Sequence, residues 1–211
     1  MTELLVATRN KKKLAEIREL LSDLDLKITS LDDYPDLPEI EEDGKTFGQN
    51  ALKKAATIAL LTKKLTMGED SGLEVKALGN RPGIYSARFS GPGATDEKNN
   101  AQLLKMLWRV PPARRQARYR CFVALVDGTR IIDVVDGQCS GVIALRRKGR
   151  NGFGYDPLFL IPRFQKTFGE LPPGIKAKIS HRSRVLKKFK TVLKKYFSSL
   201  PTANRASSRA C

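Results

Sequence analysis

Cysteine and histidine are scarce in this chain. Its 211 residues include three cysteines and one histidine. Cys121, Cys139 and Cys211 are odd in number and far apart, so the sequence lacks both a disulfide framework and the paired spacing of zinc ligands. We therefore expect reduced thiols in a cytoplasmic protein, with Cys121 and Cys139 in the hydrophobic core.

Long apolar runs are missing as well. No run approaches the roughly 20 residues that a membrane-spanning helix needs, and the opening MTELLVATRN lacks the basic region and cleavage pattern of an export signal. With 41% hydrophobic and 29% charged residues, the composition is that of a globular protein with no membrane partner. We expect one domain over 1–200 and a frayed tail over 201–211.

Acidic residues are absent from the last 41 residues, which carry 11 basic ones. The first 43 residues hold 12 acids and 6 bases, so the net charge of +17 is concentrated toward the C-terminal end. Such a field raises the local concentration of any polyanion, a nucleotide as much as RNA. Charge alone therefore does not separate a nucleotide enzyme from an RNA-binding protein.

Hydrophobic periodicity predicts an α/β fold. An apolar run over 4–8 indicates a buried strand, helical spacing over 14–24 indicates a helix, and 26–30 indicates a second strand. A strand–helix–strand unit implies parallel pairing of its strands. Further elements are expected as follows: a helix over 47–62 capped by Thr46, a strand over 66–70, a helix over 95–108, a hairpin with strands over 119–126 and 131–135, a strand over 158–162, and a basic helix over 180–200. The turn-rich segment 79–93 is too long for a simple connector, which indicates a functional loop.

The first helix begins with three consecutive lysines. Asn10 is a suitable N-cap, which places Lys11, Lys12 and Lys13 in the first turn. Exposed cations there oppose the helix macrodipole at a cost of roughly 0.3–1 kcal/mol each. Three of them suit an anion bound at the free N–H groups of the turn. A solvated basic face is the alternative interpretation.

The same pattern recurs at the start of the last helix. Ser180 can cap that helix, with His181 and Arg182 in its first turn. Such a cationic first turn again suits a bound anion. A structural role for His181 remains the alternative.

Two acidic pairs are candidates for a metal site. Glu69-Asp70 falls where an apolar strand is expected to end and a Ser-Gly turn to begin, and Glu41-Glu42 lies in the loop before the second helix. Successive strand residues point to opposite faces, so only one of Glu69 and Asp70 is expected at the site. Carboxylates from two segments suit Mg²⁺, which prefers oxygen ligands, and one of them could deprotonate a metal-polarised water.

The glycine-rich stretch NGFGYDP is a candidate for binding an aromatic ring. Gly154 permits close approach of the backbone, Phe153 or Tyr155 could stack on a base, and Asp156 could accept from a ring N–H. An ordinary turn with a core aromatic is the alternative. The sequence has no G-x-x-x-x-G-K-[ST], which disfavours a P-loop enzyme.

Together these motifs give the chain a resemblance to a known family. It resembles the inosine triphosphate pyrophosphatases, also described as XTP/dITP diphosphatases. The resemblance runs from about Leu4 to Leu186 through seven segments in family order: ATRNKKKLAEI, EEDGKTFGQNALKKA, GEDSGLEVKALGNRPGIYSARFSG, ATDEKNN, RQARYRC, GFGYDP and KISHRSRVL. It implies an ITPase-like α/β fold, an elongated mixed β-sheet flanked by helices, with an active-site cleft between two lobes.

The resemblance also implies roles for individual residues. Asp70 matches the general base and a metal ligand, Glu41 or Glu42 matches the second acidic ligand, and Ser71 lies beside the substrate. The expected phosphate-binding residues are Thr8, Arg9, Asn10, Lys11, Lys12, Lys13 and Lys54. The implied purine pocket comprises Phe153, Gly154, Tyr155, Asp156, Lys176, His181 and Arg182.

By the same resemblance, the protein is expected to cleave the purine nucleoside triphosphates ITP, dITP and XTP to the monophosphate and pyrophosphate. Mg²⁺ is the implied cofactor and a homodimer the implied assembly. The departures from the family pattern are modest: Glu69 replaces the usual Asp, and Ser183 follows SHR where Gly is common. The family offers no account of the basic C-terminal region, which leaves room for a secondary affinity for polyanions; nucleic acid is not required.

Two alternatives remain at this point. A pyrophosphatase with another base preference, such as the septum-formation-inhibitor relatives, would share the general fold. A non-enzymatic RNA-binding protein would explain the charge of +17 and predicts steeply salt-dependent binding. That second alternative leaves the acidic pairs unexplained and lacks an aromatic-rich platform.

Overall fold

The computed structural model describes residues 2–200, so the tail expected over 201–211, with Cys211, lies outside the described part. The described residues divide into two compact units. Unit 1 comprises 2–70, 122–136 and 184–200, and unit 2 comprises 71–121 and 137–183. The expectation of a single domain over 1–200 stays a prediction.

The strands confirm the mixed α/β fold. Within residues 2–200, eight strands form one sheet in the hydrogen-bonded order β2-β1-β3-β5-β6-β7-β8, with β4 paired to β3. Their bounds are β1 Thr2–Val6, β2 Leu26–Ser30, β3 Leu65–Val75, β4 Arg81–Pro82, β5 Gln116–Asp127, β6 Arg130–Ile143, β7 Phe159–Ile161 and β8 Lys166–Thr167. The hairpin between β5 and β6 was expected, and Gly128 in its turn has a φ of 58°.

Five α-helices accompany these strands in the described part of the chain. They are α1 Lys11–Leu20, α2 Phe47–Thr62, α3 Asp96–Met106, α4 Pro173–Ile179 and α5 His181–Ser199. None of them combines the length and the apolar character that a membrane crossing requires. The short helix α4 and the strands β4 and β8 were not expected from periodicity, because elements of two to seven residues are too short to show a period.

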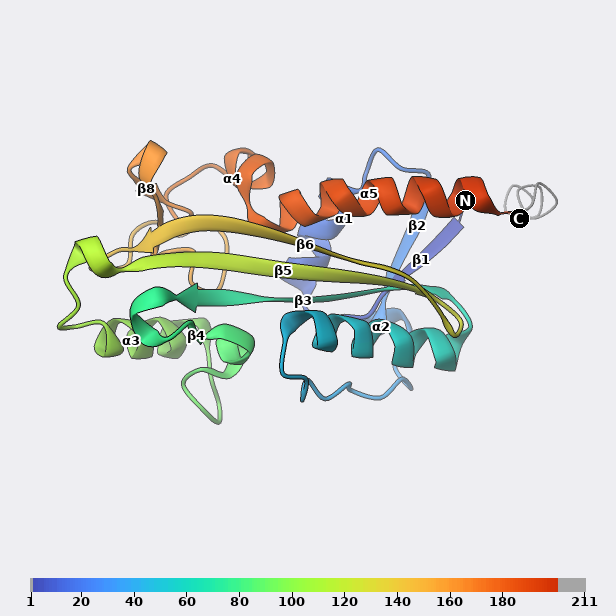
Figure 1. Ribbon diagram of the computed structural model, residues 1–211, viewed down its shortest axis with the longest axis horizontal. Helices are drawn as coiled ribbons and strands as arrows, with labels where there is room; N and C mark the ends of the chain where they lie inside the picture. The colour runs from blue at the N-terminus through green and yellow to red at the C-terminus, as the bar shows by residue number, and fades with distance from the viewer. Residues whose placement is uncertain (1, 201–211) are drawn as a thin grey trace. The chain divides into compact units, whose positions relative to one another are not determined.

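Unit 1 is built around the predicted strand–helix–strand opening. β1 pairs in parallel with β2, Leu4 facing Ile28, and in parallel with β3, Val6 facing Met67. Helices α1 and α5 lie on one face of these strands and α2 lies on the other (Figure 1). β2 and β3 flank β1 on opposite sides, so the order in which the chain adds strands to the sheet reverses at β1. The carboxyl end of β1 is therefore a topological switch point. Such switch points are where open α/β sheets bind ligands.

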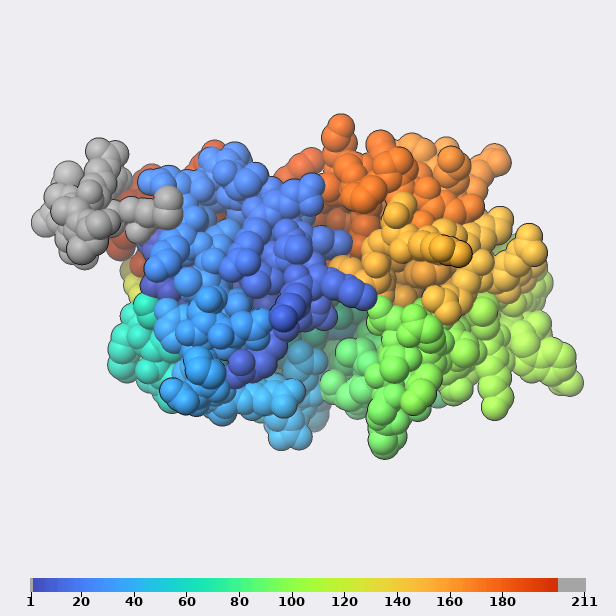
Figure 2. Space-filling model, turned by 180° about the vertical axis from the view of Figure 1, so that it is seen from behind, coloured from blue at the N-terminus to red at the C-terminus, as the bar shows by residue number. Residues whose placement is uncertain are grey.

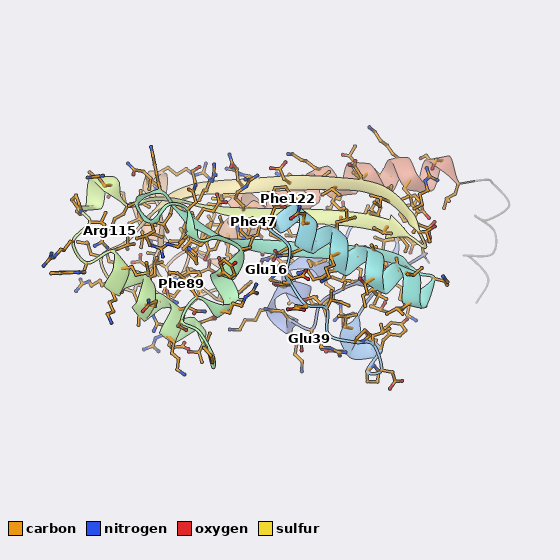
Figure 3. The ribbon with its side chains drawn as sticks, turned by 60° about the horizontal axis from the view of Figure 1, so that its bottom comes forward. Glu16, Glu39, Phe47, Phe89, Arg115 and Phe122 are labelled. Atoms are coloured by element: carbon orange, nitrogen blue, oxygen red, sulfur yellow. The ribbon has the colours of Figure 1, made fainter. Side chains whose placement is uncertain are left out.

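The helix α2 packs unusually close to the sheet. Its fully buried residues toward β5 are small: Ala51, Ala55 and Ala59 pack against Ala124 and Val126. At its first turn the rings of Phe47 and Phe122 stack with centroids 6.3 Å apart (Figure 3). On the surface, the N-terminal segment of unit 1 forms one continuous patch, drawn in blue in Figure 2.

Unit 2 has an aromatic core. Tyr119 packs against Phe159 and Phe168, with ring centroids 4.6 and 6.4 Å away, and all three side chains are buried. Cys121 and Cys139 are buried in the core, as expected. The segment 79–93 is not an irregular loop, because it contains β4 and a short 3₁₀ helix, Gly83–Arg88.

One expectation about β3 is wrong. The sequence predicted a turn after Asp70, but β3 continues through Ser71 and Gly72 to Val75. A Ser-Gly pair often marks a turn, yet glycine is tolerated in a strand where another backbone approaches closely. Asp70 and Ser71 are therefore neighbours within one strand.

Glu3 provides a test of the unit 1 fold. Burial opposes its ionisation, but hydrogen bonds from Lys64, Tyr34 and Thr29 outweigh burial and lower its pKa from 4.5 to about 2. A lowered pKa stabilises the fold above pH 4.5, and this stabilisation disappears as the pH falls toward 2. We expect Glu3→Gln to lower the free energy of unfolding at pH 7 by about 1–2 kcal/mol, after allowance for partial exposure.

Urea unfolding of both proteins between pH 7 and pH 3 measures this difference. The two free energies should converge as the pH falls. Glu39, an exposed carboxylate labelled in Figure 3, supplies the matched control, and Glu39→Gln should leave the free energy unchanged. A Glu3→Gln deficit that is constant with pH would contradict the assignment.

Candidate functional site

The start of α1 is organised as the sequence predicted. The Oδ1 of Asn10 accepts hydrogen bonds from the backbone N–H groups of Lys12 and Lys13, each at 3.1 Å. The Oγ1 of Thr8 in turn accepts from the N–H of Asn10 at 3.1 Å. This cap fixes the first turn of α1 at the carboxyl end of β1, with Lys11 and Lys12 exposed.

Arg9 has a different placement from its neighbours. Its guanidinium donates to the backbone carbonyls of Leu31 and Leu37, both at 2.9 Å. It also lies 3.9 Å from a carboxylate oxygen of Asp32. These contacts tie down the loop after β2, so the structure gives Arg9 a positioning role there.

Two adjacent acidic residues of β3 contact different helices of unit 1, α1 and α2. Glu69 is buried and its Oε1 lies 3.5 Å from Nζ of Lys13 on α1. The Oδ1 of Asp70 lies 3.9 Å from Nζ of Lys54 on α2. This division follows from the alternation of side chains along a strand, because α1 and α2 lie on opposite faces of the sheet (Figure 1).

Asp70 belongs to a network that also reaches the acidic loop. Asn50 donates to Oδ2 of Asp70 at 3.0 Å and accepts from the N–H of Gly44 at 2.8 Å. Lys54, one helical turn later, binds Oε1 of Glu42 at 2.6 Å. Asn50 was missed from the sequence, although its i, i+4 relation to Lys54 places both residues on one face of α2.

The environment of Asp70 shifts its pKa upward. Burial raises its pKa above the ordinary value, and the charge of Glu42 raises it further. The charge of Lys54, then that of Lys13 and the hydrogen bond from Asn50, lower it again. A carboxylate whose pKa is raised by burial is a better proton acceptor, which is the usual requirement for a general base.

Gly68 lets α2 approach β3 closely enough for these contacts. A Cβ at this position would lie 2.1 Å from the carbonyl oxygen of Ala51 and 2.7 Å from the backbone nitrogen of Ala55. Only glycine fits against the helix backbone at such distances. The small faces of α2 and β3 thus bring Lys54 within reach of Asp70.

The donors in this cluster suit a divalent cation. Carboxylate oxygens of Glu42 and Asp70 lie 2.6 and 3.9 Å from Nζ of Lys54. The two carboxylates therefore already converge on one positive charge. Glu41 is exposed, so of the adjacent glutamates Glu42 is the one that lies in the cluster. Among residues 2–200 no three acidic, His or Cys side chains form a ready metal site. Two carboxylates are sufficient where substrate phosphates and water complete the coordination of Mg²⁺.

A second group of predicted residues gathers in unit 2. The Oδ2 of Asp156 accepts from the N–H of Phe153 at 2.9 Å and from Nζ of Lys176 at 2.6 Å. Lys176 and Arg182 both lie over the ring of Phe153, at 4.7 and 5.6 Å from its centroid. Arg182 also donates to the Oγ of Ser71 at 3.3 Å. The half-buried ring of Phe153 is therefore surrounded by two cations.

His181 and Tyr155 are the remaining predicted aromatic residues of this group, and both are buried. The ring of His181 stacks on Tyr119 with centroids 4.6 Å apart and an interplanar angle of 16°. The hydroxyl of Tyr155 donates to the carbonyl of Ser86 at 2.8 Å, and its ring is buried. Of the two aromatics proposed for stacking on a base, Phe153 is thus the one with accessible area. His181 has the structural packing that the alternative interpretation expected.

Two residues of α3 hold Gly154 in place. Their role was not predicted, although both lie in ATDEKNN, one of the segments that carry the family resemblance. Asp96 accepts from the N–H of Gly154 and Asn100 donates to its carbonyl, each at 2.8 Å. The two residues lie four positions apart and therefore share one face of the helix. They fix a glycine with a φ of 61° in the middle of the turn that presents Phe153 and Asp156.

Comparison with known proteins identifies the family of this chain. A profile of the Ham1 family matches residues 4–192. The chain belongs to the Ham1 family. Among its relatives, the dITP/XTP pyrophosphatase of Geobacter sulfurreducens is 50% identical over 186 residues, covering 88% of this chain and 94% of that protein. The dITP/XTP pyrophosphatase of Desulforamulus reducens is 45% identical over 195 residues, covering 92% and 97%.

Solved structures of Ham1 proteins share the fold. The HAM1 protein from Coxiella burnetii gives a TM-score of 0.85 at 38% identity, covering 92% of this chain and all of that one. The Ham1 protein of Staphylococcus aureus gives 0.83 at 34% identity with the same coverage. The Ham1 fold is therefore established for this chain.

The packing at Gly68 can be tested directly. We expect Gly68→Ala to lower the free energy of unfolding by about 2–3 kcal/mol, because the added methyl group must push α2 away from β3. Gly174 in α4 is the matched control, since a Cβ there meets nothing within 4 Å. Gly174→Ala should be neutral or stabilising by about 0.5–1 kcal/mol. Urea unfolding of the two variants measures both effects, and equal changes would contradict the close approach.

Proposed function

We propose that this protein is a nucleoside triphosphate pyrophosphohydrolase that cleaves deaminated purine nucleotides, dITP, ITP and XTP, to the monophosphate and pyrophosphate. The observation that carries the proposal is Asp70, a buried carboxylate held by Asn50 beside Lys54 and Glu42. The relatives named dITP/XTP pyrophosphatase support it, at 45–50% identity over most of the chain. Removal of such nucleotides from the cytoplasmic pool is the role that this activity implies.

The residues around α1 and α2 act on the phosphates. The first turn of α1 offers backbone N–H groups beside Lys11, Lys12 and Lys13, which suits an anion. Lys13 and Lys54 stabilise the negative charge that develops on the departing pyrophosphate, an electrostatic contribution to catalysis. Glu42 and Asp70 would hold Mg²⁺, which supplies charge neutralisation and polarises the attacking water when bound.

Asp70 is the general base of this proposal. It accepts the proton of the water that attacks the α-phosphorus, while the bond from that phosphorus to the bridging oxygen breaks and pyrophosphate leaves. Asn50 holds Oδ2 by a hydrogen bond of 3.0 Å, which fixes the orientation of the carboxylate. The raised pKa of Asp70 increases its affinity for the proton.

The residues around Phe153 recognise the base. Its ring offers a surface for stacking on a purine, and Lys176, Arg182 and His181 supply donors. Donors suit a carbonyl at the 6-position of the purine, which hypoxanthine, xanthine and guanine all carry. Low activity on GTP is expected instead from the family resemblance, which implies a preference for 6-oxo purines without the 2-amino group of guanine. Adenine carries an amino group at the 6-position, so a buried donor would lose its partner, at a cost of about 1–3 kcal/mol. That cost corresponds to roughly a 5-fold to 150-fold discrimination against ATP.

A panel of nucleotides tests the proposed function. ITP, XTP, GTP and ATP are each supplied with Mg²⁺, and pyrophosphate and orthophosphate are assayed separately. Pyrophosphate from ITP and XTP, with little from GTP or ATP, is the expected result. Orthophosphate release, or no turnover by folded protein, would overturn the proposal. Omission of Mg²⁺ tests the metal requirement, and sedimentation of the same sample tests the homodimer that we also propose.

Asp70→Asn is the control for the role of Asp70 within this panel. The amide is nearly isosteric with the carboxylate but accepts no proton, so turnover should fall by at least 100-fold. Binding of ITP, measured by calorimetry, should change far less, because Lys13 and Lys54 remain. Full activity of the variant would exclude Asp70 as the base.

Asp96 tests the support of the base-binding turn. Asp96→Ala removes the acceptor for the N–H of Gly154, and loss of one hydrogen bond of about 1 kcal/mol should raise the KM for ITP roughly 5-fold, with kcat changed less. Asp96→Asn keeps an acceptor oxygen and should restore most of the affinity. Glu97, the exposed next residue, is the control, and Glu97→Ala should leave KM unchanged. Equal KM values for all three variants would contradict the role of Asp96.

A further inference from the structure

The outer face of α5 is composed almost entirely of basic residues. Between positions 184 and 195 every exposed side chain except Thr191 is a lysine or an arginine. These residues, called the α5 stripe here, are Arg184, Lys187, Lys188, Lys194 and Lys195. At 100° per residue they fall within an arc of about 120°, and they extend over about 16 Å of helix. The stripe lies entirely on the unit 1 part of α5.

The opposite face of α5 is apolar and packs into the hydrophobic core. Val185, Leu186, Phe189 and Leu193 are at most 1% exposed, and the hydroxyl of Tyr196 binds Asp127 of β5 at 2.7 Å. A helix that binds a membrane surface needs an apolar face free to enter the lipid. The apolar face of α5 is already buried in its own domain, which disfavours a lipid surface as the partner.

The stripe has no acidic partner within α5 itself; the acidic neighbours of its residues include Asp136, near Lys188, and Asp23, near Lys194. No acidic residue occurs from position 171 to the end of the sequence, so the helix has no internal ion pairs of opposite sign. Like charges three or four positions apart, such as Arg184 with Lys187 and Lys188, destabilise a helix. Arg184 also lies near the N-terminal end, where the macrodipole disfavours positive charge. Lys188 of the stripe lies 3.3 Å from Asp136 of β6. Both side chains are about half exposed, so salt screens this ion pair and it adds little to stability.

We propose that the α5 stripe binds the phosphate backbone of double-helical nucleic acid, without sequence preference. A duplex carries about one negative charge per 1.7 Å of its axis, so a stripe of about 16 Å faces several phosphates at once. No aromatic side chain is exposed between positions 184 and 195, so this surface offers no stacking platform of the kind that single strands use. The proposal uses none of the residues assigned to nucleotide hydrolysis and does not depend on that function.

Salt dependence of binding to a duplex tests the proposal. The full-length protein is titrated into a fluorescent 24-base-pair DNA duplex of mixed sequence, at NaCl concentrations from 25 to 200 mM, and anisotropy is recorded. Neutralisation of up to five phosphates predicts a slope of log K against log salt approaching roughly −4.5. The variant K187Q/K188Q/K194Q/K195Q should bind at least 10-fold more weakly at 50 mM salt, and its slope should be smaller by about 3–4.

A variant of equal net charge is the control. K76Q/K105Q/R114Q/K166Q removes four exposed positive charges from unit 2 and should weaken binding by less than 3-fold at 50 mM salt. Thermal unfolding followed by circular dichroism verifies that both variants are folded. Equal losses in the two variants would show a general charge effect and overturn the proposal, as would no binding of duplex by the parent protein. A different result would assign the surface to a membrane: phosphatidylserine vesicles capture the parent protein but not the stripe variant, and the parent protein does not bind the duplex.

Discussion

The close approach of α2 to β3 is the constraint on which the catalytic cluster depends. Gly68 leaves room for the backbone of α2, and the alanine face of that helix continues the tight packing along the sheet. The result is that Asn50 and Lys54, one turn apart on α2, both reach Asp70. Because Gly68 and the small side chains of the alanine face let α2 lie close to β3, little of the Asp70 side chain remains exposed to solvent. Burial of this carboxylate is therefore a consequence of how the helix meets the strand.

Buried charge is the common property of the two residue groups. Glu69 and Asp70 are at most 4% exposed, and Asp156, Lys176 and Arg182 are at most 7% exposed. Removal of ions from water is costly, and each of these has a partner of opposite charge or a hydrogen-bonding partner that offsets part of the cost. Hydrophobic side chains at these positions would stabilise the fold at least as well. The retention of so many charges in the interior is what the proposed nucleotide-binding role would explain.

The positive charge of the chain has two separate sources. Lys13, Lys54, Lys176 and Arg182 lie among acidic or aromatic partners in the candidate site. The lysines of the α5 stripe are exposed and face away from the core, on a helix that contains no acidic residue. The first set accounts for recognition of a small anion, and the family relationship is consistent with that role. The second set includes none of the residues of the candidate site, and this separation is why it supports an independent surface.

Local sequence patterns were sufficient to predict the elements with clear periodicity and clear caps. The bounds of α2 and β2, the Asn10 cap and the parallel opening follow from local patterns, and the motif order pointed to the correct family. Tertiary structure alone decided the partners of each charge: that Glu42 rather than Glu41 meets Lys54, that Asn50 holds Asp70, and that Asp96 and Asn100 fix Gly154. It also carried β3 through the expected Ser-Gly turn. Local patterns record propensity, whereas these contacts join residues up to 58 positions apart and arise only when helices pack on the sheet.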